Sequence, residues 1–252
     1  MEKVVLEDTE KIEKYEDLIL ERDELLCVCD NLEIEYQKLF GKEVIDIFKE
    51  EMECVKLKKM IAYIQKKKNN GEEIKPVELN LELEKEMLIY NTKLEKMIFN
   101  LESSKEAKYI SPYETQEVKK IYRKIAKVIH PDCCDIGVFG EDIGKLWSQV
   151  YNAYRNNNLK AIREASILLN KKLKDNNTIP LIHVFIDDLD ELINAITDEI
   201  MDIRVNVPYT YKDWIYDEKK VKEKHAENKK QLEEYKEYKK ELKSILEDLN
   251  AN

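Results

Sequence analysis

The residues best placed to act chemically are His130, Pro131 and Asp132, which directly follow a lysine-rich segment. The chain has only three histidines and five prolines, so this tripeptide stands out. A proline fixes its own φ and disfavours a helical conformation at the residue before it, which ends a helix there. The tripeptide therefore predicts an open loop that presents an imidazole ring and a carboxylate, two groups that form directional hydrogen bonds.

The segment before the tripeptide, residues 117–129, predicts an amphipathic helix with a basic face. Its hydrophobic residues recur at helical spacing. The basic residues lie off that stripe: Lys119, Lys120, Arg123, Lys124 and Lys127. The whole chain carries a net charge of −10, so a local basic face would steer it toward an acidic patch on a partner. The alternative interpretation is an ordinary solvated helix face, because exposed charges of this kind are common.

Capping signals set the bounds of this helix and of the ones that follow. Ser111 is the expected N-cap, with Glu114 as its capping-box partner and Pro112 in the first turn. A second amphipathic helix is expected from the hydrophobic residues Leu146, Trp147, Val150, Ala153 and Tyr154. Asn157 or Asn158 then caps a third helix. Two helices joined by a loop that opens with the tripeptide form a specific arrangement.

This arrangement resembles a J domain, the module of DnaJ-like co-chaperones. The resemblance rests on "EVKKIYRKIAKVIHPD" (117–132) and "KLWSQVYNAY" (145–154), within residues 111–172. In this family the module docks on a DnaK-type heat-shock chaperone and stimulates its ATP hydrolysis, while the J protein itself performs no chemistry. The resemblance implies that the chaperone-binding residues are His130, Pro131, Asp132, Lys119, Lys120, Arg123, Lys124 and Lys127.

The chain departs from the family pattern in several places. A first helix with a Tyr-rich, Leu-Gly element is missing ahead of the basic helix, and Cys133 and Cys134 replace the usual lysine and asparagine. Neither a Gly/Phe-rich linker nor a CxxC zinc repeat is present, so this is not a full-length DnaJ. A second interpretation stays open: a coiled-coil scaffold or adaptor whose J-like module no longer activates a chaperone. An exposed tripeptide and basic face would favour the co-chaperone, and a covered one would favour the scaffold.

The cysteines raise one further hypothesis. Cys133 and Cys134 beside His130 suggest a thiol switch or a zinc site, but neighbouring cysteines lack zinc spacing and no second pair follows. We expect no metal and no cofactor. Cys27, Cys29 and Cys54 are expected to be small buried residues. Motifs for a nucleophile, a phosphate loop or a zinc protease are absent from the sequence, so no enzymatic activity is expected.

Outside the J-like module the composition predicts helix almost throughout, since 38% of residues are charged and only five are glycine. Hydrophobic residues recur every three or four positions over 15–39, 83–101 and 221–249, which is typical of coiled-coil seams. We predict an all-α fold in three parts. These are a helical arm at 1–110 with breaks near Gly41 and Gly71, the J-like module at 111–178, and a C-terminal helical hairpin arm at 179–252. Short connections favour antiparallel hairpins, and the arms should pack together within one chain or between two.

Two polar residues and an aromatic group in the C-terminal arm leave alternatives open. His225 and Asn228 occupy seam positions of the last helix. They indicate either a seam that is partly exposed or a polar pair that sets the register of the helix pairing. Trp214 and the tyrosines around it predict a packed corner between helices or a recognition surface.

Composition also narrows the class of partner. The negative net charge argues against nucleic acid, and no run approaches the roughly eighteen apolar residues of a membrane span. The acidic N-terminus lacks a secretory signal, and five cysteines without framework spacing suit a reducing cytoplasm. We therefore expect a cytoplasmic protein that binds a DnaK-type chaperone, and that recruits a protein client or another copy through its helical arms.

Overall fold

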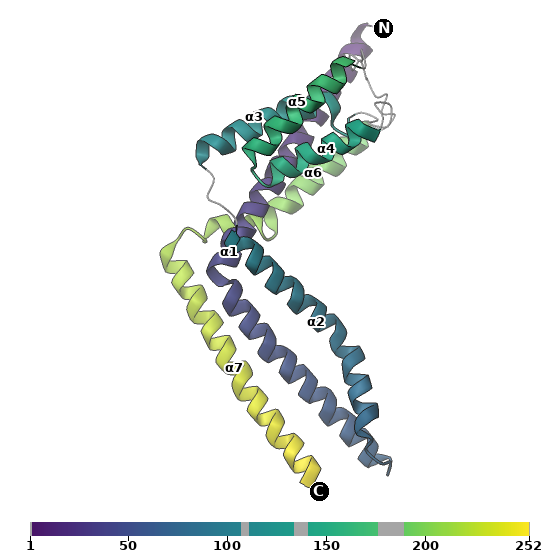
Figure 1. The fold of residues 1–252 in the computed structure, drawn as a ribbon, viewed down its shortest axis with the longest axis vertical. Coiled ribbons are helices and arrows are strands. Elements are labelled where there is room, and N and C mark those ends of the chain that lie inside the picture. The colour runs from purple at the N-terminus through teal and green to yellow at the C-terminus, as the bar shows by residue number, and fades with distance from the viewer. Residues whose placement is uncertain (1, 107–110, 134–140, 176–188, 252) are drawn as a thin grey trace. The chain divides into compact units, whose positions relative to one another are not determined.

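The computed structural model describes residues 2–106, 111–133, 141–175 and 189–251, and within them the regular structure is helical, without strands. The helices are α1 (Glu2–Asn69), α2 (Pro76–Glu106), α3 (Pro112–Ile129), α4 (Glu141–Arg155), α5 (Leu159–Asp175), α6 (Leu189–Val205), the 3-10 helix η2 (Tyr209–Asp213) and α7 (Glu218–Ala251) (Figure 1). The predicted all-α class is confirmed. Among the described residues, no helix is both long enough and apolar enough to cross a membrane.

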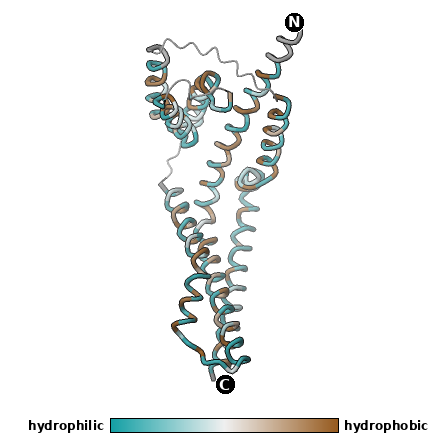
Figure 2. Tube along the Cα trace, turned by 90° about the vertical axis from the view of Figure 1, so that its right-hand side faces the viewer, coloured by the Kyte–Doolittle hydropathy of each residue, from teal (hydrophilic) through white to brown (hydrophobic). Residues whose placement is uncertain are grey.

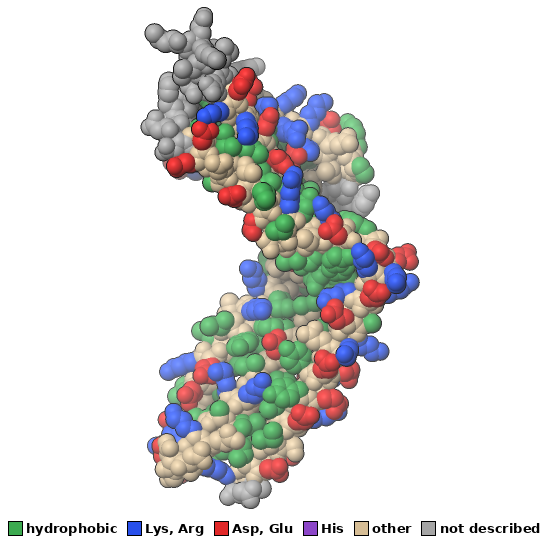
Figure 3. Space-filling view, turned by 180° about the vertical axis from the view of Figure 1, so that it is seen from behind, with side chains coloured by type: hydrophobic (Ala, Val, Ile, Leu, Met, Phe, Trp, Pro, Cys, Tyr) green, Lys and Arg blue, Asp and Glu red, His purple; other side chains and the backbone are tan. Residues whose placement is uncertain are grey.

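The chain forms two compact units, and each is built from separate stretches of sequence. The first contains residues 1–32 and 108–210, and the second contains residues 33–107 and 211–252. α1 therefore contributes to both. These units differ from the three consecutive segments expected from the sequence, because the beginning of α1 belongs with the J-like module. On the face drawn in Figure 3, basic and acidic side chains are interspersed.

In the first unit, α1 lies between two hydrophobic cores. One core is formed with α3, α4 and α5, to which α1 contributes Leu20 and Cys27. Its other buried members are Val118, Tyr122, Ile125, Ala126, Ile129, Ile143, Trp147, Val150, Ala153, Tyr154, Ile162, Ala165 and Leu169. The second core joins another face of α1 to α6 and contains Tyr15, Ile19, Leu25, Ile193, Ile196 and Ile200. The N-terminal part of α1 is therefore an internal element of this unit.

The bounds of α3 follow the predicted capping pattern. The backbone N–H of Glu114 donates to Oγ of Ser111 at 3.2 Å, and the backbone N–H of Ser111 donates to Oε2 of Glu114 at 3.1 Å. This reciprocal pair is a capping box, and Pro112 fills the first turn. The helix ends at Ile129 because His130 is extended, with φ −63° and ψ 131°, as a residue before proline prefers to be.

The connection between α4 and α5 selects one of the two predicted caps. Asn157 has φ 48°, a left-handed conformation that asparagine adopts more readily than most residues. Oδ1 of Asn158 accepts a hydrogen bond from the backbone N–H of Ala161 at 3.0 Å. Asn158 is therefore the N-cap of α5.

The second unit consists of the later part of α1 packed with α2 and α7, where hydrophobic and hydrophilic residues alternate along each helix (Figure 2). α1 and α2 form the expected hairpin through residues 70–75, and Gly71 there has φ 66°, which favours glycine. Two cores join the helices. One contains Phe48, Met52 and Met87, and the other contains Cys54, Leu57, Ile61 and Leu242. The N- and C-terminal arms thus pack together within one chain here.

The break predicted at Gly41 is wrong, because α1 continues through it without interruption. A Cβ at Gly41 would lie 2.7 Å from Oε1 of Gln37 and 2.9 Å from Cδ1 of Leu101, which belongs to α2. The glycine therefore allows a close approach between two helices. A glycine inside a helix costs only about 1 kcal/mol relative to alanine, which tertiary packing readily outweighs.

The polar residues on the seam of α7 form defined contacts with α1. Nδ1 of His225 lies 2.7 Å from Oε1 of Glu43, and Nδ2 of Asn228 donates to Oε2 of the same carboxylate at 2.9 Å. Asn228 is only 3% exposed. These contacts favour the register-setting interpretation over a partly exposed seam.

The aromatic residues around Trp214 form a packed corner. Tyr211 stacks on Tyr36 with ring centroids 4.4 Å apart, and Trp214 lies against Phe40 at 5.7 Å. The packed-corner interpretation is therefore confirmed for Tyr211 and Trp214. Tyr216 differs, since its side chain is largely exposed.

Candidate functional site

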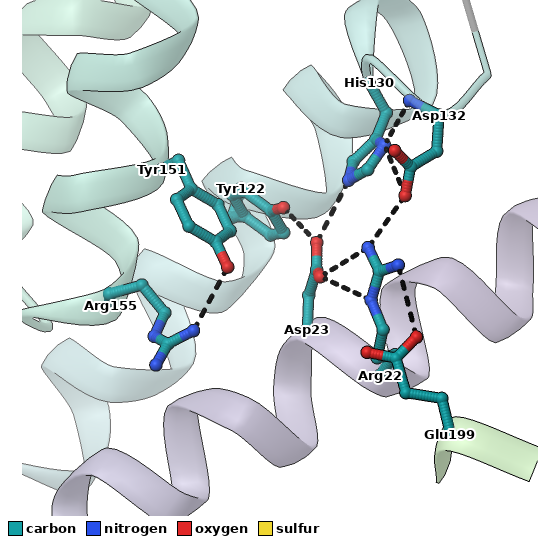
Figure 4. Close-up of polar contacts among 8 residues, drawn as sticks. All are labelled: Arg22, Asp23, Tyr122, His130, Asp132, Tyr151, Arg155 and Glu199. Atoms are coloured by element: carbon teal, nitrogen blue, oxygen red, sulfur yellow. Dashed lines mark hydrogen bonds and ion pairs between the residues drawn. The ribbon is translucent and has the colours of Figure 1, made fainter. Parts of the chain in front are cut away.

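The side chain of His130 points into the first unit and is only 5% exposed (Figure 4). This contradicts the expectation of a ring presented outward. Nε2 lies 3.1 Å from Oδ2 of Asp23 on α1, and the ring meets that of Trp147 edge-on at 5.0 Å. Nδ1 accepts a hydrogen bond from the backbone N–H of Asp132 at 3.1 Å. Because Nδ1 accepts, the ring proton belongs on Nε2, which donates it toward Asp23.

Asp23 is the centre of this polar cluster, although it is only 1% exposed. The hydroxyl of Tyr122 donates to Oδ2, and Nη2 of Arg22 lies 3.1 Å from Oδ1. Burial alone would raise the pKa of Asp23. The hydrogen bonds from His130 and Tyr122, together with the charge of Arg22, hold that pKa below its usual value. A buried carboxylate is tolerable only with such partners.

The proton of Tyr122 is held firmly by the same arrangement. Burial, and then the nearby charge of Asp23, raise the pKa of the Tyr122 phenol. The ring also stacks on Tyr154 with centroids 3.9 Å apart. Tyr122 therefore acts as a fixed donor that is locked in place by the core of α3, α4 and α5.

Asp132 is held by a single guanidinium on α1. Nη2 of Arg22 lies 2.9 Å from Oδ2 of Asp132, and Nη1 lies 3.7 Å from Oε2 of Glu199 on α6. Burial opposes the charge of Arg22, but the carboxylates of Asp23 and Asp132 raise its pKa above the usual value. Arg22 thus links the tripeptide loop, α1 and α6 through one permanently charged group.

Part of the basic face of α3 is paired with α1. Nζ of Lys119 lies 2.6 Å from Oε2 of Glu24, and Arg123 pairs with Oε1 of the same carboxylate. Glu24 therefore provides an acidic partner for these two residues within the same chain. These pairs are partly exposed, so each contributes little to stability by itself.

The rest of the basic face stays accessible. Lys127 lies 3.7 Å from Asp17 of α1, but its side chain is 55% exposed. Lys120 lies 3.8 Å from Glu117 of its own helix and is 65% exposed. Lys124 is also exposed. Pro131 is exposed as well, so the tripeptide and the basic face are covered in part and not throughout.

The sequence interpretation missed the segment Arg22 to Glu24 of α1, which contacts the tripeptide and the basic face. Arg22 lies at a seam position of the pattern over 15–39, where a charged residue is out of place, and this was the available signal. A further contact supports the same packing. Nη2 of Arg155 lies 2.6 Å from Oδ1 of Asp30 on α1. Nη1 of Arg155 donates to the hydroxyl of Tyr151 at 3.1 Å, as Figure 4 shows.

The cysteines within the described residues are free thiols. Cys27, Cys29 and Cys54 are buried, as predicted, and burial raises the pKa of Cys27 to about 11. Cys133 is partly buried. Cys134 lies outside the described residues, so the thiol switch stays a prediction. Across the described ranges there is no group of three or more His, Cys, Asp or Glu side chains arranged to hold a metal ion.

Comparisons with protein-family models, with curated proteins and with solved structures found no match to this chain. The resemblance to a J domain therefore rests on the sequence pattern of residues 117–132 and 145–154.

Proposed function

We propose that this protein is a helical scaffold or adaptor whose J-like module is closed by α1 and does not activate a DnaK-type chaperone. The observation that carries this proposal is the burial of His130 against Asp23. A chaperone that used the imidazole of His130 would have to separate this pair. The helical arms then provide the binding function, toward a protein partner in the cytoplasm, and no enzymatic step is assigned to the chain.

The energetic cost of opening the site supports this choice. Separating a buried pair of hydrogen-bonded polar groups costs on the order of 3 kcal/mol. A partner that binds only the open form loses that amount, which is a reduction in affinity of roughly 100-fold. Leu20 and Cys27 add to the cost, since α1 cannot withdraw without exposing the core of α3, α4 and α5.

The second candidate function is a J-type co-chaperone, and one observation favours it. Pro131, Lys120, Lys124 and Lys127 keep exposed side chains, so a chaperone could meet this surface before any contact with α1 is broken. In this case the closed arrangement is a resting state, and the chaperone itself displaces the acidic residues of α1.

The experiment that separates the two is the single-turnover ATPase rate of a DnaK-type chaperone with the full chain added. Three forms are compared: wild type, His130→Gln, and the double variant Arg22→Ala/Glu24→Ala. The double variant releases Asp132 and the basic face but leaves the core residues of α1 unchanged. Glu13→Ala/Lys14→Ala is the matched control, because both side chains are exposed on the same helix.

The scaffold proposal expects no stimulation by any folded form, with folding checked by circular dichroism. Stimulation by wild type that His130→Gln abolishes would overturn the scaffold and establish the co-chaperone. Stimulation by the Arg22→Ala/Glu24→Ala variant alone would also overturn it, because the module would then be competent once Asp132 and the basic face are released, even with Asp23 still in contact with His130.

A further inference from the structure

The face of α2 that points away from α1 carries an ordered stripe of side chains. Leu79, Leu83 and Met87 are buried on one side of the helix. On the other side lies the α2 stripe, which consists of Leu81, Lys85, Leu88, Thr92, Glu95 and Phe99. The steps between its members alternate between four and three residues, which is the spacing of a coiled-coil seam. The helix therefore has a second seam that the second unit does not use.

The hydrophobic members of the α2 stripe are well exposed. The exposed fractions are 54% for Leu81, 64% for Leu88 and 68% for Phe99. Lys85 and Glu95 are exposed as well, and neither has an ion-pair partner within the described residues. A single exposed hydrophobic residue needs no explanation, but a regular row on one helix face indicates an interaction surface.

The order of residue types along the stripe is complementary to its own reverse. If two α2 helices cross antiparallel about a two-fold axis near residue 90, Leu81 faces Phe99 of the second copy. In the same arrangement Lys85 faces Glu95 of the second copy, and Leu88 faces Thr92. Because the axis repeats each contact, two Lys–Glu pairs flank the centre and two Leu–Phe contacts lie outside them. The next seam positions, Glu78 and Glu102, face each other beyond these contacts, and Glu78 is already paired with Lys67 of its own chain at 3.6 Å. A parallel pair in register would instead place Lys85 against Lys85 and Glu95 against Glu95.

We propose that two copies of this chain associate antiparallel through the α2 stripe. The self-complementary charge order selects a second copy as the occupant and selects the antiparallel orientation. The contact from Leu81 to Phe99 extends over about 27 Å at the 1.5 Å rise of a helix. α2 is already folded against α1, so association does not have to pay for forming the helix. A shift of one heptad toward the N-terminal end would place Lys85 against Leu88, so the polar positions favour the register about residue 90.

The test is the mass in solution by light scattering, across a dilution series, of the full chain and of charge-reversed variants. Wild type is expected to approach twice the chain mass of 30.0 kDa. Lys85→Glu alone, or Glu95→Lys alone, places like charges in opposition and is expected to give a monomer. The double variant Lys85→Glu/Glu95→Lys restores both pairs and is expected to give a dimer again.

Mixing gives the sharpest result. The Lys85→Glu chain and the Glu95→Lys chain are each monomeric, but an equimolar mixture restores opposite charges at every site and should form a mixed dimer. Glu82→Lys and Lys105→Glu are matched controls, with the same charge changes on exposed positions outside the stripe, and should dimerise like wild type. A monomeric wild type, or single variants that dimerise as well as wild type, would overturn the proposal.

Discussion

Nη2 of Arg22 lies 2.9 Å from Oδ2 of Asp132, although 110 positions separate the two residues in the sequence. Oδ2 of the next residue, Asp23, lies 3.1 Å from Nε2 of His130. Two consecutive residues of α1 therefore contact the two polar residues of the tripeptide. Whatever the J-like module does, it does with α1 as part of its structure, so the N-terminal residues cannot be treated as a separate arm.

Asp23→Asn is expected to destabilise the first unit by about 2 kcal/mol, because it weakens the charge-assisted hydrogen bonds that His130, Tyr122 and Arg22 make. The measurement is urea unfolding followed by tryptophan fluorescence in a Trp214→Phe background. The chain has two tryptophans, so Trp147 then reports on the first unit alone.

The control for this measurement is Asp17→Asn, a carboxylate on the same helix whose side chain is 74% exposed. Its effect should stay within about 0.5 kcal/mol, as for most surface substitutions. Equal unfolding midpoints for wild type and Asp23→Asn would show that the buried carboxylate contributes nothing net to stability.

The stabilisation from Asp23 is expected to depend on pH. Its pKa is lower in the folded chain than in the unfolded chain, so the unfolded state binds the proton more readily. The contribution is therefore complete above the unfolded value of about 4, and is lost as the pH falls through the lower folded value. The difference in unfolding free energy between wild type and Asp23→Asn should be constant from pH 7 to about 5. It should shrink below about 4, and a difference that persists there would contradict the assignment.

Arg22→Ala is expected to loosen the tripeptide loop more than it destabilises the unit. Asp132 would lose its ion pair with Arg22. Two hydrogen bonds within the loop would remain, from the backbone N–H of Cys133 to the carbonyl of His130 at 2.9 Å and from the backbone N–H of Asp132 to Nδ1 of His130 at 3.1 Å. Hydrogen exchange of a peptide that covers residues 125–133 measures this directly. We expect faster exchange in Arg22→Ala than in Lys14→Ala, an exposed position of α1. Identical exchange in the two variants would mean that Arg22 does not restrain the loop.

The local elements of this fold were predictable because their signals are local. The capping box of Ser111 and Glu114 and the helix stop before Pro131 depend on residues at most three positions apart. The spacing of hydrophobic residues likewise identified the buried faces of α3 and α4. These features follow from backbone hydrogen bonding and helix period, which a short stretch of sequence contains in full.

The cover over His130 was not predictable in the same way. Asp23 and His130 are 107 positions apart, and the sequence around each residue contains no signal that predicts contact with the other. The partition of α1 between two units is also a tertiary result, because one uninterrupted helix hides the boundary after Leu32. The helix break predicted at Gly41 failed for a related reason. From the sequence alone, a glycine that permits close helix packing cannot be distinguished from a glycine that ends a helix.

Glu43→Ala is expected to destabilise the second unit by about 1–2 kcal/mol, because it leaves the buried amide of Asn228 without its acceptor and removes the contact with His225. Unfolding should be followed through Trp214 in a Trp147→Phe background. Glu53→Ala, an exposed carboxylate on the same helix, is the matched control. If both variants unfold alike, the polar contact does not set the pairing of α1 and α7.

Gly41→Ala is expected to leave the second unit as stable as wild type or to stabilise it by up to about 1 kcal/mol. Alanine gains about that amount of helix propensity. The new Cβ would come within 3 Å of only the side-chain ends of Gln37 and Leu101, which are flexible and can shift away. Gly41→Leu should instead destabilise the unit, because a side chain of that size would push α2 away from α1. Urea unfolding of the two variants separates the roles of the glycine. A large loss in Gly41→Ala would mean that the helices cannot yield at this point, and a tolerated Gly41→Leu would mean that they are not in close contact there.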